Sequence, residues 1–290
     1  MPMMWVGVVI ALVGALGYAL GAALQQHVAV ADGATLKLVR RPRWWIGGVI
    51  GFAGAALHAV ALSFAPLIVI QPVSVTTLVF AVPLAAMLYG RRPHRLEIIG
   101  SIAVTLGLLG LMMLVPTHNT PPVLGDRHAV GFLAIVGLVV VVCRLVARRL
   151  TGPLKATALA VAAGVVTASV STFVRVVGGG LHGDLSRLLH WFTLAVPVLL
   201  IWAVVLLQHS YAVGYFGIAY AVVQVVDPIT SVLAGVLLLG EPVPTGIGNV
   251  IPASIAAALL IAGTVMLGRM APDHISKERT PGAPVPIGVP

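Results

Sequence analysis

The chain has 290 residues, of which 59% are hydrophobic and only 9% are charged. A soluble globular domain carries about 25% charged residues, and no folded core could hide this much apolar surface from water. The composition therefore excludes a water-soluble globular protein, and we expect lipid to surround most of the chain.

The formal net charge of +9 would suggest a nucleic acid partner if the protein were soluble. Here the basic residues stand in short loops between apolar runs, and the sequence has no basic patch interleaved with aromatic residues. The charge is typical of a membrane protein, so we expect the lipid bilayer as a partner and no nucleic acid.

Nine apolar stretches are long enough to cross the hydrocarbon as helices. A crossing takes about 20 residues, because each backbone N–H must be satisfied within its own segment. The stretches are 4–27, 44–65, 67–89, 96–115, 128–147, 156–179, 191–208, 215–239 and 248–268. The sequence thus predicts an all-α membrane protein of about nine transmembrane helices.

The first stretch ends near Ala29-Val30-Ala31, which looks like a signal-peptide cleavage site. No positive charge precedes it, and it is longer than the apolar core of a signal peptide. We therefore interpret it as a transmembrane helix.

Most basic residues fall on one side of the membrane if the helices number nine. This side holds 14 of the 17 Lys and Arg residues: Lys37, Arg40, Arg41, Arg43, Arg91, Arg92, Arg95, Arg144, Arg148, Arg149, Lys155, Arg269, Lys277 and Arg279. Positively charged loops stay in the cytoplasm, so we expect an external N-terminus and a cytoplasmic C-terminus in the cell membrane. The Pro-rich stretch after the ninth helix, 269–290, is predicted to be a disordered cytoplasmic tail.

Two helix ends resemble each other at a distance of 150 residues. The third helix ends in Met87-Leu88-Tyr89-Gly90 and the eighth in Leu237-Leu238-Leu239-Gly240, on opposite sides of the membrane. On this basis we divide the chain into a first repeat of four helices, 1–115, and a second repeat of five helices, 128–268. An inverted repeat of this kind is common in secondary transporters; the alternative is coincidence in an apolar chain.

Leu239-Gly240-Glu241, with Pro228 placed 13 residues before the glutamate, resembles the EamA-type repeat of the drug/metabolite transporter (DMT) superfamily. That resemblance implies an inverted-repeat bundle and small-solute transport.

A closer resemblance runs through the first half. Arg41-Pro42-Arg43-Trp44-Trp45, Gly54, Ser63-Phe64-Ala65-Pro66, Gln71-Pro72-Val73 and Leu88-Tyr89-Gly90 resemble the NIPA-like magnesium transporters. This family also has nine helices and an external N-terminus. The chain departs from it at Ala55, where the family has a glutamate, at His58, where it has an asparagine, and at Gln25-Gln26-His27, which replaces a basic cluster. Losing the acid argues against magnesium, which prefers carboxylate ligands.

Asp227 is the only acid expected near the middle of a transmembrane helix. A central Asp costs about 2.5–3.5 kcal/mol to insert, so it usually has a role. Pro228 follows it and is predicted to break the helix locally. Our hypothesis is that Asp227 binds substrate or exchanges a proton; the alternative is a structural Asp that supports a proline kink.

Other polar residues accompany Asp227. Gln224 lies one turn before it on the same face, His58 stands midway along the second helix, and Gln71 precedes Pro72 near the outer end of the third. They are expected to line the pathway, to shuttle protons in the case of His58, or to form hydrogen bonds between helices.

Further groups receive structural interpretations. We expect Gln25-Gln26-His27 and Gln208 to cap helices at the interface, and Glu97 to be solvated. Gly14, Gly17 and Gly21 are spaced for close helix contact, either within the chain or at the seam of a homodimer. Cys143 is the only cysteine, so neither a disulfide nor a Cys-based metal site can form within one chain.

No P-loop, HExxH, GxSxG or CxxC motif is present, and we predict no enzyme, no cofactor and no metal site. The favoured function is secondary transport of a small solute or metabolite. The alternatives are a magnesium or other cation transporter, and a non-transporting membrane partner or lipid-intermediate translocation subunit in envelope biogenesis.

Overall fold

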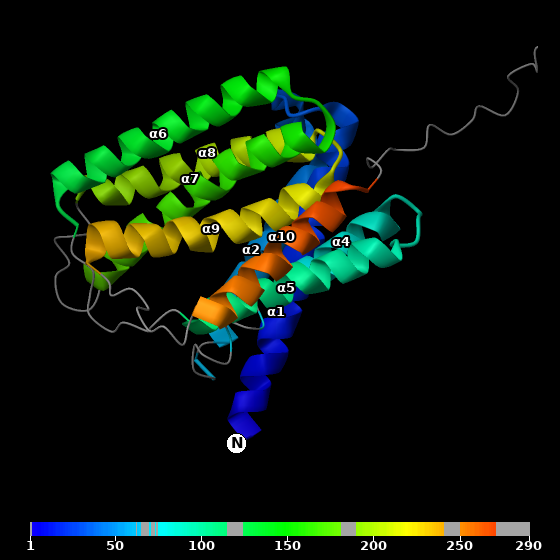
Figure 1. The fold of residues 1–290 in the computed structure, drawn as a ribbon, viewed down its shortest axis with the longest axis horizontal. Helices are drawn as coiled ribbons and strands as arrows, with labels where there is room; N and C mark the ends of the chain where they lie inside the picture. Colours follow the sequence, from blue (N-terminus) through cyan, green and yellow to red (C-terminus); the bar gives the residue numbers. More distant parts are fainter. Residues whose placement is uncertain are drawn as a thin grey trace, which may run out of the picture.

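A computed structural model describes residues 2–61, 63–64, 70, 73, 75–114, 124–180, 190–240 and 250–270 (Figure 1). These residues form nine α-helices and one 3₁₀-helix, and they contain no strand. The elements are α1 (Pro2–Asp32), η1 (Leu36–Arg40), α2 (Pro42–Ala61), α4 (Thr77–Leu88), α5 (Arg95–Leu114), α6 (Asp126–Arg149), α7 (Gly152–Gly180), α8 (Trp191–Tyr211), α9 (Phe216–Leu239) and α10 (Val250–Gly268).

Eight of these helices are long and apolar enough to cross a membrane. The exception, α4, covers the second half of the predicted stretch 67–89, and most of the first half lies outside the described residues. The prediction of a multi-pass membrane protein is confirmed. α1 continues past Ala29, which is fully buried, so this segment belongs to the bundle.

Consecutive helices run in opposite directions. The Trp191 Nε1 donates to the Asp126 Oδ1 at 3.0 Å, which joins the start of α8 to the start of α6. The Gln208 Nε2 donates to the Gln25 Oε1 at 3.2 Å, which joins the last turn of α8 to the final third of α1. We call the end of the bundle where α1 begins the N-end, and the end where α1, α4, α6, α8 and α10 terminate the C-end.

Two groups of helices make up the bundle. α7 packs against α6, α8 and α9, and these four lie side by side in Figure 1. In the other group α1 packs against α2 and α4, and α5 packs against α10. α10 comes last in the chain but packs against α5 of the first half, so the two halves of the chain are joined by this helix pair.

α1 and α2 approach each other through glycines. A Cβ added to Gly54 would lie 2.5 Å from the carbonyl oxygen of Gly14, and one added to Gly21 would lie 2.5 Å from that of Gly47. Such contacts require small residues, because the backbones themselves touch. The glycine spacing predicted either an intrachain contact or a homodimer seam, and the structure uses Gly14, Gly17 and Gly21 within the chain.

The prediction that Glu97 is solvated is wrong. Glu97 is 5% exposed, and its carboxylate accepts hydrogen bonds from Arg91 Nη1 and Nη2, both at 2.8 Å. The His94 backbone N–H donates to the same carboxylate at 2.7 Å. The acid is buried because three donors from the α4–α5 connection satisfy it, a condition that the sequence alone does not reveal.

Some predictions lie outside the described residues. These are the pathway role of Gln71 and the disordered tail beyond Met270.

Candidate functional site

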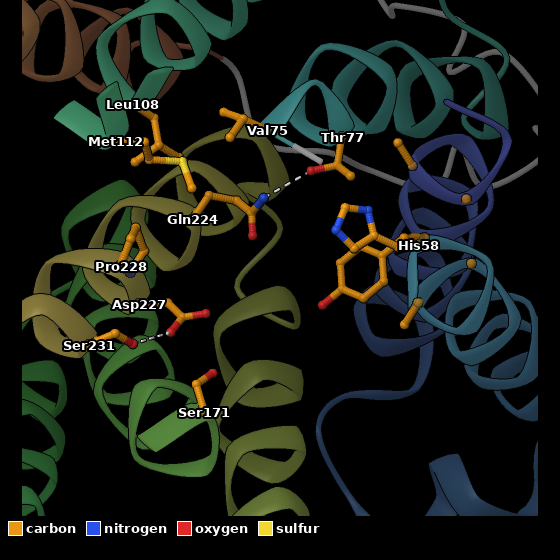
Figure 2. Close-up of a pocket in the computed structure, with 15 residues that line it drawn as sticks. His58, Val75, Thr77, Leu108, Met112, Ser171, Gln224, Asp227, Pro228 and Ser231 are labelled. Atoms are coloured by element: carbon orange, nitrogen blue, oxygen red, sulfur yellow. Dashed lines mark hydrogen bonds between the residues drawn. The ribbon is translucent and has the colours of Figure 1, made fainter. Parts of the chain in front are cut away.

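A cavity of about 470 Å³ lies between the two groups of helices (Figure 2). Its described lining comes from α1, α2, α5, α7, α9 and the start of α4: Gly14, Ala15, Tyr18, Gly54, Ala55, His58, Val75, Thr77, Leu108, Met112, Ser171, Gln224, Asp227, Pro228 and Ser231. Small-molecule sites usually have volumes of about 300–1,000 Å³, so a small solute fits this space.

α9 supplies most of the polar lining. Asp227 stands at the middle of the helix, and its Oδ1 accepts a hydrogen bond from Ser231 Oγ at 3.3 Å. Gln224, one turn earlier, lines the same cavity and donates through Nε2 to Thr77 Oγ1 at 2.9 Å. Figure 2 shows Gln224 and Asp227 facing the same space, with Ser171 of α7 beside them.

Pro228 does not interrupt α9. The helix runs without a break from Phe216 to Leu239, so the predicted local break is wrong. Proline has no N–H, so the Gln224 carbonyl loses the donor that would normally come from position 228. The ring itself forms part of the cavity wall. The Gln224 carbonyl oxygen therefore lacks its usual helical N–H donor at the level of the cavity, although the helix stays continuous.

The opposite wall comes from α1 and α2. His58 and Ala55 line it from α2, and Tyr18 lines it from α1, where it is 41% exposed. Both positions at which the chain departs from the NIPA-like pattern in α2 thus lie at the cavity.

The C-end side of the cavity is filled by packed side chains. Tyr211, Phe216 and Tyr220 are at most 3% exposed. The ring centroid of Phe216 lies 5.3 Å from that of Tyr211 and 5.3 Å from that of Tyr220. Cavity residues of α2, α5 and α7 lie in the later part of each helix, toward the N-end. The cavity therefore belongs to the N-end half of the bundle.

Hydrogen-bonded side chains continue this closure toward the C-end. Gln26 is fully buried and accepts from the Tyr89 hydroxyl at 3.1 Å, and Gln208 is 3% exposed and bonds Gln25. We call Gln25, Gln26, Tyr89, Gln208 and Tyr211 the sealed layer. The interpretation of these glutamines as interfacial caps is wrong, because they pair across helices inside the bundle.

A second cavity, of about 570 Å³, lies beyond the sealed layer. Its lining is His27, Val28, Ala31, Asp32, Arg41, Pro42 and Arg43. Asp32 and Arg41 form a bidentate ion pair at 2.7 Å, and this hydrogen bonding raises the pKa of Arg41 above its usual value. From Tyr18 to His27, α1 rises by about 14 Å, and this length separates the two cavities.

The structure brings together four of the five predicted site residues. Asp227, Gln224, Pro228 and His58 line one cavity, and Gln71 lies outside the described residues. Among the polar lining residues, sequence reasoning missed Tyr18, Ser171 and Ser231. Only Ser231 could have been found from the sequence, because it stands four residues after Asp227 on the same helix face.

Comparisons with known proteins report a relative of similar length. An uncharacterized protein of Corynebacterium glutamicum is 26% identical over 281 residues, which cover 90% of this chain and 94% of the relative. No family model matches the chain. No solved structure matches it. The similarity extends over nearly the whole of both chains and assigns no activity to either.

Proposed function

We propose that this protein is a secondary transporter of the DMT superfamily, which moves a small solute across the cell membrane by alternating access. One observation carries the proposal: a cavity where the two groups of helices meet, with the Asp227 carboxylate at the middle of a membrane-spanning helix. An acid in this position is expensive to insert, and transporters use such groups to bind substrates and coupling ions.

The pairing of helices supports an inverted repeat. Each contact in the first half has a counterpart in the second: α1–α2 with α7–α8, α1–α4 with α7–α9, and α4–α5 with α9–α10. α1 begins at Pro2 and α7 at Gly152, at opposite ends of the bundle. The last helices of the two repeats, α5 and α10, pack against each other, and α6 is the additional helix of the five-helix repeat.

The helix ends that first suggested the repeat also share their conformation. α4 is followed by Gly90 with φ +68°, and α9 is capped by Gly240 with φ +67°. Residues with a side chain rarely adopt this left-handed conformation, so glycine is favoured at both ends. The likeness of the two endings therefore has a structural reason, and it is compatible with two related units, although Gly33 after α1 and Gly214 after α8 have the same conformation.

The proposed orientation places the C-end in the cytoplasm and the N-end outside. Basic residues then lie on the cytoplasmic side where α2, α5 and α7 begin and where α6 ends. This distribution is what the positive-inside rule requires. The cavity around Asp227 belongs to the external half, and the sealed layer closes the cytoplasmic half.

A magnesium transporter is the less favoured candidate. The described lining contributes a single carboxylate, and Ala55 and His58 stand where the NIPA-like pattern has a glutamate and an asparagine. Divalent cations are held by several oxygen ligands, among which carboxylates are preferred. Uptake of magnesium into proteoliposomes that requires Asp227 would favour this candidate over a small solute.

Cysteine accessibility tests alternating access without knowledge of the solute. Cys143 is the only cysteine, so a Cys143→Ser variant gives a background in which Ser171→Cys marks the cavity. We expect a membrane-impermeant maleimide to label residue 171 in vesicles of both orientations, because the cavity opens to each side in turn. The matched control is Ser254→Cys, an exposed position on α10 outside the cavity lining, which we expect to stay unlabelled in lipid. Labelling of residue 171 from one side only would contradict the proposal.

A further inference from the structure

We infer that the solute is a primary amine with an apolar body and no carboxylate of its own. This inference rests on the proposed function, since it names the substrate class of the same cavity. It depends on three properties of the lining, namely its charge, its hydrogen-bonding groups and its apolar surface.

The charge of the described lining is that of one carboxylate. Asp227 is its only acid, and the same fifteen residues include no Lys or Arg. The hydrogen bond from the Ser231 hydroxyl is long, at 3.3 Å, and neutral. A carboxylate removed from bulk water is stabilised most by a cation placed against it. A positively charged solute would supply this partner when it enters.

The hydrogen-bonding groups around Asp227 suit a donor. The Gln224 Nε2 is engaged by Thr77 at 2.9 Å, which leaves the Gln224 Oε1 as the part of the amide that can accept from a solute. The hydroxyls of Ser171 and Ser231 line the same space and can also accept. An ammonium group has three N–H donors and no acceptor, so it matches this set. A quaternary ammonium has the charge without the donors.

The remaining lining is apolar. Val75, Leu108 and Met112 form an apolar surface next to Gln224, as Figure 2 shows. They can contact a hydrocarbon chain or a ring while the amine lies against Asp227. At about 30 Å³ per water, the space of about 470 Å³ holds roughly 15 waters, so a solute with a single ring fits easily.

The same properties disfavour other classes. The carboxylate of an amino acid would enter a cavity that already holds the Asp227 carboxylate and whose described lining has no Lys or Arg. The one basic side chain in that lining, His58, stands on the opposite wall from Asp227. Burying a charge without a partner is costly, so the zwitterion should bind worse than the amine made from it by decarboxylation. A neutral alcohol of the same shape leaves Asp227 without its cation.

Four matched probes test the inference by calorimetry on the full chain in lipid nanodiscs. They are 2-phenylethylamine, its N-trimethyl derivative, 2-phenylethanol and phenylalanine. We expect the primary amine to bind most tightly, the trimethyl compound more weakly, and the alcohol and the amino acid at least about tenfold more weakly than the amine. This series needs only the wild-type protein, so it does not depend on a variant that folds.

Asp227→Asn should weaken binding of the amine about 10- to 100-fold, the range expected for losing a hydrogen bond to a charged group. The matched control is Asp126→Asn at the start of α6, outside the cavity, where an amide oxygen can still accept from Trp191 Nε1. This variant should bind the amine as the wild type does. Equal binding of the amine by Asp227→Asn would overturn the inference.

Two further outcomes would also overturn it: the alcohol or the amino acid binding as tightly as the amine, or none of the amines binding. Neither would remove the proposed function, because labelling of residue 171 from both sides does not depend on the solute. Labelling from one side, together with amine binding that requires Asp227, would instead reject transport and leave an amine-binding membrane protein.

Discussion

One helix, α1, borders two different environments along its length. Around Tyr18 it faces the cavity, and this side chain is 41% exposed. Two to three turns later it enters the sealed layer, where Gln26 is fully buried and hydrogen-bonded to Tyr89. The difference arises from the neighbours: small residues and hydroxyls surround the cavity, whereas large aromatic rings fill the space toward the C-end.

The two environments are held by different kinds of contact. The wall at Tyr18 rests on direct contact between the α1 and α2 backbones at glycines, a close packing that leaves no room for added atoms. The sealed layer rests on single hydrogen bonds between side chains of different helices. Such bonds contribute about 0.6 kcal/mol on average in membrane proteins, so they can break and re-form during a conformational change. The three predictions that follow test this contrast.

The largest expected effect is on the cavity wall. In Gly54→Ala the new Cβ would lie 2.5 Å from both the Gly14 carbonyl oxygen and the Tyr18 backbone nitrogen, so the two helices must separate. We expect a loss of about 3 kcal/mol in stability, at the upper end of typical overpacking costs. Thermal unfolding in nanodiscs measures it.

Gly131→Ala in α6 is the matched control, because a Cβ there meets nothing within 4 Å. The better helix propensity of alanine should leave its stability unchanged or raise it by up to about 1 kcal/mol. Equal stability of the two alanine variants would mean that the α1–α2 wall is not a rigid contact.

Hydropathy was sufficient to predict the helices, because insertion into lipid depends mainly on the length and composition of each segment. Four site residues were also predictable for a related reason. A polar group such as Asp227 is so costly at mid-helix that its presence alone indicates a cavity or a partner.

The errors concern polar residues nearer the helix ends. Glu97 and Gln26 stand where a side chain can reach water, and the sequence gives no sign that Arg91 or Tyr89 will bury them. Tyr18 was missed for the converse reason, since a tyrosine on an apolar helix is usually a packing residue. In each case the environment depends on a side chain from another segment, which local patterns do not contain.

The second prediction compares two ion pairs near the C-end. Glu97→Gln removes the buried partner of Arg91, whose side chain is 37% exposed, so we expect a loss of about 1–2 kcal/mol in stability. Asp32→Asn breaks the more exposed pair with Arg41, in which the Asp32 and Arg41 side chains are 17% and 57% exposed, and should cost less than about 1 kcal/mol. Similar losses in the two variants would show that burial does not decide the strength of contacts at this end.

The smallest effect is expected in the sealed layer itself, and it should appear in conformation more than in stability. Gln208→Leu removes the hydrogen bond to Gln25, and it also removes an Oε1 that is buried without a partner among the described residues. The two changes oppose each other, so stability should change by less than about 1 kcal/mol.

The same variant removes the hydrogen bond that joins α8 to α1, which belong to different repeats in the proposed fold. That bond contributes at most about 0.6–1 kcal/mol to the closed state, part of which the removal of the unpartnered Oε1 returns, so the population open to the C-end should rise by up to about three- to fivefold. Labelling of residue 171 from that side, in the Cys143→Ser background, should increase by the same factor. Ser210→Ala is the control, because its hydroxyl bonds the Ala156 carbonyl at 2.9 Å and joins α8 to α7 within one repeat. If Ser210→Ala changed the labelling as much as Gln208→Leu, the contact between repeats would have no special part in closure. The contrast between a rigid wall at Tyr18 and a sealed layer whose hydrogen bonds can break and re-form would then fail.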